Sequence, residues 1–115
     1  MPQRQPMAKN DRVLSVLSLA MKAGRIASGE TAVMNAIRNA SAFLVLIAED
    51  ASAGTSKKFS DKSTYYNVPC RVYGTKEMLA HSIGKELRSV IAVCDEGFAG
   101  SILQRLEEAD INGKQ

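Results

Sequence analysis

The spacing of apolar residues predicts helices over much of the first 40 residues of the chain. From Asn10, whose side chain can cap a helix, apolar residues recur three and four positions apart as far as Gly24. Gly24 suits the left-handed conformation that ends many helices. A second stripe at the same spacing, with Ser28 as its expected cap, runs from Val33 to Ala40.

Further along the chain, helical segments alternate with short runs that are apolar throughout. Strands are expected at 43–48, 70–73 and 89–94, and helices at 52–66, 75–82 and 97–108. Continuous apolar runs indicate strands that are covered on both faces. The pattern therefore predicts an α/β fold, a three-layer α/β/α sandwich with a mixed, mostly parallel four-stranded sheet. We expect one domain over residues 9–109, with flexible tails at 1–8 and 110–115.

Charge permits a nucleic-acid partner without requiring one. The chain of 115 residues has 15 lysines and arginines against 12 acids, a net charge of +3. Residues 1–38 carry six basic and two acidic side chains, so a basic face is expected. No apolar run reaches the length of a membrane span, and we therefore expect a cytoplasmic protein with no membrane partner.

The sequence has no motif of a known catalytic site. It lacks a dinucleotide-binding or nucleotide-binding glycine loop, a nucleophile elbow and a metal-spaced cluster of histidines and cysteines. We expect no enzymatic activity, no cofactor and no metal. The lone His81 is expected at the surface or near a helix end. Cys70 and Cys94 lie in apolar runs and are expected to be buried, reduced thiols.

Two acidic pairs, Glu49-Asp50 and Asp95-Glu96, each follow a strand and precede a helix. Carboxylates at such positions cap helices and interact favourably with the helix dipole, and this is the expected role. The alternative is that both pairs line the pocket of a small enzyme or ligand-binding domain.

The segment Ser28-Gly29-Glu30 opens a helix, and a helix N-terminus presents backbone N–H groups that suit a phosphate. Gly29 is equally compatible with a tight turn. Lys57, Lys58 and Lys62 are either the solvated face of the third helix or contacts to RNA, and the sequence leaves both open.

Several short segments of the chain are informative through their order and spacing. They are Leu17-Ser-Leu-Ala-Met-Lys-Ala-Gly24-Arg25, Ser28-Gly29-Glu30, Ala36-Ile37-Arg38, Leu44-Val-Leu-Ile-Ala-Glu-Asp50-Ala51, Asp61-Lys62, Tyr65-Tyr66-Asn67-Val68-Pro69, Leu79, Ile83-Gly84-Lys85 and Asp95-Glu-Gly97-Phe98-Ala99. Together they resemble the kink-turn RNA-binding family of ribosomal proteins, and most closely its short bacterial members. The resemblance covers about Lys9 to Leu103.

The resemblance implies a protein that holds sharply bent, structured RNA, with ribosomal RNA as the expected partner. The helix that starts at Gly29 would enter the groove at the kink, with Arg25 and the amides of Gly29 to Thr31 at phosphates. Thr31 and Asn35 would contact base edges, and the loop from Ile83 to Arg88 would cover the extruded nucleotide. The implied RNA-binding residues are Arg25, Ser28, Gly29, Glu30, Thr31, Asn35, Arg38, Ile83, Gly84, Lys85, Glu86, Leu87 and Arg88.

The chain departs from the best-known archaeal pattern of this family at the start of that helix. Thr31, Ala32 and Asn35 stand where that pattern has asparagine, glutamate and lysine. Ala32 cannot hydrogen-bond a base edge, although Glu30 could partly replace the missing acid. An alternative function is therefore a protein-interaction module of the translation or transcription machinery, with ribosomal or other translation and transcription proteins as partners, that kept the fold but not the specific reading of RNA.

Overall fold

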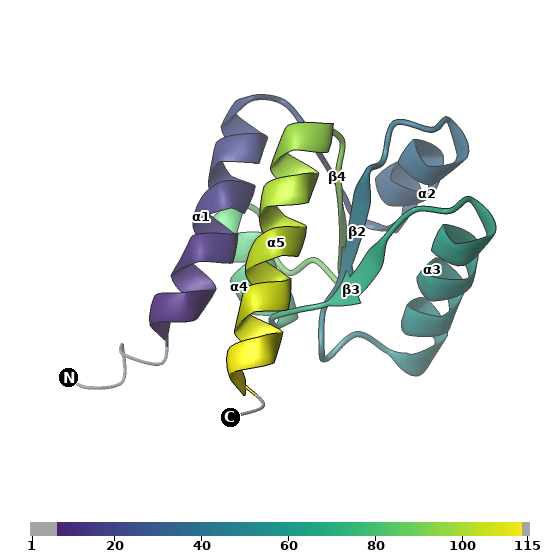
Figure 1. The fold of residues 1–115 in the computed structure, drawn as a ribbon. Helices are drawn as coiled ribbons and strands as arrows, with labels where there is room; N and C mark the ends of the chain where they lie inside the picture. The colour runs from purple at the N-terminus through teal and green to yellow at the C-terminus, as the bar shows by residue number, and fades with distance from the viewer. Residues whose placement is uncertain (1–6, 114–115) are drawn as a thin grey trace.

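The computed structural model describes residues 7–113 of the chain. Within this range five helices alternate with four strands (Figure 1). The elements are α1 (Met7–Lys22), β1 (Ile26–Ser28), α2 (Glu30–Arg38), β2 (Leu44–Ile47), α3 (Ala53–Tyr65), β3 (Cys70–Val72), α4 (Lys76–Ser82), β4 (Val90–Val93) and α5 (Glu96–Gly113).

The four strands form one mixed sheet in the order β1-β4-β2-β3. β2 and β3 are parallel, whereas β4 runs antiparallel to both of its neighbours, β1 and β2. The predicted mixed four-stranded sheet is therefore confirmed, but the expectation that it is mostly parallel was wrong, since only β2 and β3 pair in parallel. The strand that the sequence did not reveal is β1, a segment of three half-buried residues.

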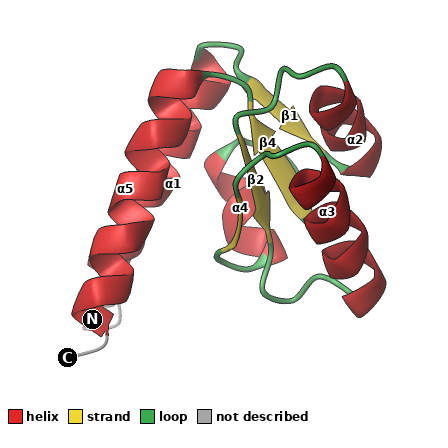
Figure 2. Ribbon diagram, turned by 45° about the vertical axis from the view of Figure 1, so that its right-hand side comes forward, coloured by secondary structure: helices red, strands yellow, loops and turns green. Residues whose placement is uncertain are grey.

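Helices cover both faces of the sheet, so that α1, α4 and α5 lie on one side and α2 and α3 on the other (Figure 2). Successive residues of a strand point to opposite faces. Leu44 and Leu46 accordingly enter the core under α1, α4 and α5, while Val45 and Ile47 enter the core under α2 and α3. This double burial explains why residues 44–47 are apolar without interruption.

Several predicted helix ends are confirmed. Gly24 follows α1 with a φ of 75°, and its N–H donates to the Met21 carbonyl over 3.0 Å. Thr75 caps α4, since its hydroxyl accepts from the Met78 amide over 3.1 Å. An Asp95 carboxylate oxygen accepts from the Phe98 amide over 2.9 Å at the start of α5.

Other predicted boundaries were wrong. Asn10 does not cap α1, because the helix already begins at Met7 and continues through Asn10. Ser28 does not cap α2, because it is the last residue of β1 and Gly29 takes the cap position. Ala40 is exposed beyond the end of α2, with a φ of 65°, and is not part of its buried stripe.

The two ends of the chain differ in part from the predicted tails. Met7 and Ala8 belong to α1, and the backbone of α5 continues to Gly113, beyond the helix end expected at Glu108. The rest of the tail predicted at 1–8, and the last two residues of that predicted at 110–115, lie outside the described residues. No helix in the described part of the chain is both long enough and apolar enough to cross a membrane.

Candidate nucleic-acid interface

The N-terminus of α2 opens at the edge of the sheet where β1 ends and β4 begins. Gly29 has a φ of 90°, and its N–H donates to the Val90 carbonyl over 3.1 Å. No described side chain accepts a hydrogen bond at this cap. Since the first amides of a helix have no partner within the helix, those of Glu30, Thr31 and Ala32 are available to an anion.

The loop of residues 83–88, between α4 and β4, lies beside this helix start. The Arg88 Nε donates to the Ser28 hydroxyl over 3.3 Å. The Arg88 Nη1 donates to the carbonyls of Glu86, over 2.6 Å, and Leu87, over 3.0 Å. One guanidinium thus holds the shape of the 83–88 loop and ties it to the residue before Gly29. Two segments of the predicted site that are distant in the sequence meet here.

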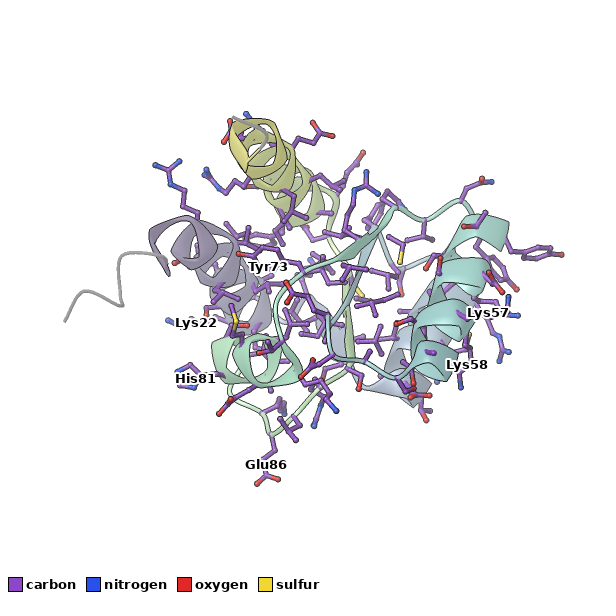
Figure 3. The ribbon with its side chains drawn as sticks, turned by 90° about the horizontal axis from the view of Figure 1, so that it is seen from below. Lys22, Lys57, Lys58, Tyr73, His81 and Glu86 are labelled. Atoms are coloured by element: carbon purple, nitrogen blue, oxygen red, sulfur yellow. The ribbon has the colours of Figure 1, made fainter. Side chains whose placement is uncertain are left out.

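The side chains of the 83–88 loop differ in what they can offer to a ligand. Leu87 is 61% exposed, and the side chain of Glu86 extends outward from the loop (Figure 3). Gly84, with a φ of 71°, and Lys85 are also exposed. Ile83 is different, because it is 4% exposed and packs in the core under α1, α4 and α5. Its side chain supports the loop from below and is not presented to the outside.

A groove of about 360 Å³ runs between α2 and α3. The exposed side chains of Thr31 and Asn35 lie one helical turn apart along it, and Arg38 follows at the end of α2. Its lining residues are Glu30, Thr31, Met34, Asn35, Arg38 and Lys58. The residues of α2 that were predicted to contact bases, and the cation Arg38, therefore share one open surface.

Glu30 is held in this groove by two residues of α3. One carboxylate oxygen lies 3.0 Å from the Lys58 Nζ, and the other accepts from the Thr55 hydroxyl over 3.0 Å. The Lys58 ammonium, and after it the Thr55 hydroxyl, lower the pKa of Glu30. Sequence patterns do not reveal this arrangement, because the partners come from different helices.

Lys57 and Lys62 are not part of the α2–α3 groove. The Lys57 Nζ lies 3.0 Å from an Asp61 carboxylate oxygen on its own helix, and Lys57 lines a separate hollow beside β3. Figure 3 shows Lys57 and Lys58 together on α3, and His81 on the outer side of α4. His81 is exposed, which confirms its expected place at the surface.

The structure places Arg25 at the opposite end of β1 from Gly29. β1 separates the two residues, and Ile26 pairs with Val93 at the far end of the strand from Gly29. The Arg25 carbonyl accepts from the Cys94 amide over 2.7 Å at that end. Arg88, in contrast, bonds the residue that precedes Gly29.

The two acidic pairs lie at opposite edges of the sheet. Asp50 follows β2, and one of its carboxylate oxygens accepts from the Lys76 amide at the start of α4, over 2.8 Å. Asp95 follows β4 and caps α5. Because β2 and β4 are antiparallel, their carboxyl ends point in opposite directions. The pairs cannot line one pocket. Asp95 has the capping role that the sequence predicted, whereas Asp50 bonds an amide of α4 and not of α3, the helix that follows it and that Ser52 caps.

Cys70 and Cys94 are free thiols, as predicted, but each is half-buried where full burial was expected. Burial is the main cause that raises the pKa of both thiols. Among the described residues, no three His, Cys, Asp or Glu side chains gather as a metal site would require.

Fold and site together define a small α/β/α domain whose helix N-terminus, flanked by cations, suits a polyanion. The chain belongs to the ribosomal protein L7Ae/L30e/S12e/Gadd45 family, whose model matches residues 11–102.

Two curated relatives share most of their length with this chain. It is 48% identical over 92 residues to the RNA-binding protein YlxQ of Bacillus subtilis (strain 168), covering 80% of this chain and 92% of the relative. It is 38% identical over 96 residues to the RNA-binding protein YlxQ of Enterococcus faecium, covering 84% of this chain and 92% of that relative. The predicted resemblance to short bacterial members of the family is thereby confirmed.

Solved structures support the same fold. A protein with unknown function from Bacillus halodurans matches with a TM-score of 0.81 and 38% identity, over 84% of this chain and 97% of its own. The 15.5 kD RNA-binding protein of Giardia lamblia matches with a TM-score of 0.72 over 90% of this chain and 88% of its own. The second protein is 15% identical, so this likeness concerns the fold alone.

Proposed function

We propose that the protein is a non-enzymatic RNA-binding protein that recognises kinked, bulge-containing structured RNA, with ribosomal RNA as its target in the cytoplasm. Membership of the family and the names of the two bacterial relatives, both RNA-binding proteins, support RNA as the ligand. The observation that carries the proposal is the uncapped start of α2 at Gly29, to which the Arg88–Ser28 bond attaches the 83–88 loop.

In this proposal the amides at the start of α2 bind a phosphate, with Arg88 beside them. A helix N-terminus favours anions through both its unpaired N–H groups and its dipole. A glycine at position 29 lets the RNA backbone approach, because nothing lies within 4 Å of where a Cβ would project. Lys85 and Arg38 add positive charge on the two sides of this site.

Different parts of the protein surface would recognise the base sequence and the bent shape of the RNA. Thr31 and Asn35 offer hydrogen bonds to base edges in the groove opened by the kink. The exposed Leu87, with the backbone of Gly84 and Glu86, would pack against the extruded nucleotide. Ser28 would act through Arg88, and Ile83 by supporting the loop from the core. Arg25 would contact a phosphate further along the RNA.

The test is a binding titration with a short RNA that has a three-nucleotide bulge beside tandem guanine–adenine pairs. The control RNA has those pairs replaced by Watson–Crick pairs. We expect tight binding to the first RNA, a large loss on the second, and affinity that falls steeply as salt rises. Equal, weak binding to both RNAs would refute kink recognition and leave only a general attraction to phosphate.

A protein-interaction module of the translation or transcription machinery is the second candidate. Tyr65 and Tyr66 favour it, because they are 77% and 40% exposed and their rings pack edge to face with centroids 5.0 Å apart. They lie at the C-terminal end of α3, whereas the proposed RNA site is near its N-terminal end. Association with ribosomal proteins that survives nuclease treatment and is lost in a Tyr65→Ser variant would support this candidate.

A further inference from the structure

A chain of polar contacts leads from the cap of α3 into the α2–α3 groove. The Ser52 hydroxyl accepts from the Thr55 amide over 3.1 Å and donates to the Thr55 hydroxyl over 3.0 Å. The Thr55 hydroxyl donates in turn to Glu30, whose other oxygen pairs with the Lys58 ammonium at 3.0 Å. Glu30 is thereby fixed from one side, and it directs Lys58 toward the groove that Thr31 and Asn35 line.

Lys58 keeps the capacity to bind a second anion. An ammonium group has three donors, and the structure assigns one of them to Glu30. The Lys58 side chain is 53% exposed, so water or a ligand can reach the remaining donors. Its neighbour Lys57 differs, because it pairs with Asp61 on the same helix and faces the hollow beside β3.

We propose that Lys58 is an RNA-contacting residue, which Glu30 positions so that a cation from α3 meets a phosphate of the RNA strand that enters the α2–α3 groove. This inference rests on the function proposed above and adds a second helix to the site. Before RNA binds, Glu30 compensates the charge of Lys58. When RNA is bound, the ammonium bridges the carboxylate and the phosphate, so Glu30 is a positioning residue.

The experiment compares Lys58→Gln with Lys57→Gln, which removes the same charge from the adjacent position of the same helix. Each protein is titrated with the bulged RNA at several salt concentrations, and its urea midpoint is measured without RNA. We expect Lys58→Gln to weaken binding by about threefold to tenfold. The plot of log affinity against log salt, whose slope is negative, should become shallower by about one unit. Lys57→Gln should keep the wild-type slope, and Lys58→Arg should restore it.

The alternatives give different results. If Lys58 only ties α3 to α2, Lys58→Gln will weaken binding with an unchanged salt slope, which overturns the proposal. Equal effects of both glutamine variants would also overturn it, since they would show that RNA affinity depends only on the total positive charge of the protein. If wild-type protein discriminates between the bulged RNA and its Watson–Crick control while Lys58→Gln equals wild type, this inference fails and the proposed function stands. If wild-type protein does not discriminate, the proposed function itself fails.

Discussion

The Nε of Arg88 lies 3.3 Å from the hydroxyl of Ser28, and this hydrogen bond joins the loop before β4 to the strand before α2. Ser28 immediately precedes Gly29, so a movement of the 83–88 loop would move the guanidinium away from the start of the helix. The pairing of β1 with β4 and the Gly29–Val90 backbone bond already hold the two segments together, and Arg88 adds a side-chain link while it bonds two carbonyls of its own loop.

Two substitutions of Arg88 distinguish the contribution of its charge to RNA binding from the contribution of its hydrogen-bond geometry. A lysine keeps the charge but has no planar fork of donors, so Arg88→Lys should loosen the loop and weaken binding of the bulged RNA several-fold with an unchanged salt slope. Arg88→Gln should also make that negative slope shallower by about one unit. The control is Arg71→Lys, at an exposed arginine of β3 that bonds its neighbour's carbonyl. If Arg88→Lys binds as tightly as wild type, the bond to Ser28 does not order the site.

Gly29 combines a positive φ with open space around it. Gly29→Val should destabilise the fold by about 1–3 kcal/mol, because a β-branched residue is strained at a φ of 90°. No described atom lies within 4 Å of the added Cβ, so the protein should still fold. Binding of the bulged RNA should be lost, because the side chain would cover the first amides of α2.

Urea unfolding and RNA titration of the same preparation measure both effects. Gly100→Ala is the control, since Gly100 also has open space around it but lies within α5 and has no positive φ. This variant should bind as wild type does. A folded Gly29→Val protein with wild-type affinity would remove Gly29 from the interface.

The sequence was sufficient for the fold because the buried strands are apolar throughout. Residues 44–47 and 90–93 are covered on both faces, and this environment leaves an unmistakable run in the sequence. β1 left no such run, because it has three half-buried residues and depends on pairing with the distant β4. Ser28 is a residue type that commonly caps helices, but the cap here has a φ of 90°, which favours Gly29.

The site could be predicted in its segments but not in its contacts. Gly29 and the 83–88 loop were found from a helix start and a family resemblance. The bonds of Arg88 to Ser28 and of Lys58 to Glu30 join residues from different elements, and no periodicity reports such pairs. Ile83 was assigned to RNA contact because its burial is not evident from the sequence. That burial depends on α4 packing against the sheet.

The half-buried thiols predict a loss of stability at alkaline pH. Burial raises the pKa of Cys70 and Cys94 in the folded protein, so folding favours the neutral thiol. The resulting stabilisation is fully present below the unfolded thiol pKa, roughly 8.5, and is lost as pH rises through the folded values. Urea midpoints should fall between neutral pH and about pH 10 more steeply for wild type than for Cys70→Ala/Cys94→Ala. Parallel pH profiles of the two proteins would contradict this expectation.

Within the 83–88 loop, substitutions of Leu87 and Ile83 best distinguish an effect on RNA binding from an effect on stability. Leu87 is 61% exposed, so Leu87→Ser should leave the urea midpoint nearly unchanged and weaken binding of the bulged RNA, because an apolar contact to the extruded nucleotide is lost. Ile83 is 4% exposed, so Ile83→Ala should cost about 2–5 kcal/mol of stability through the cavity that it leaves. At a temperature where both variants are fully folded, the Ile83→Ala protein should retain more RNA affinity than Leu87→Ser. The reverse order would mean that the side chain at position 83 reaches the RNA and that the loop rearranges when RNA binds.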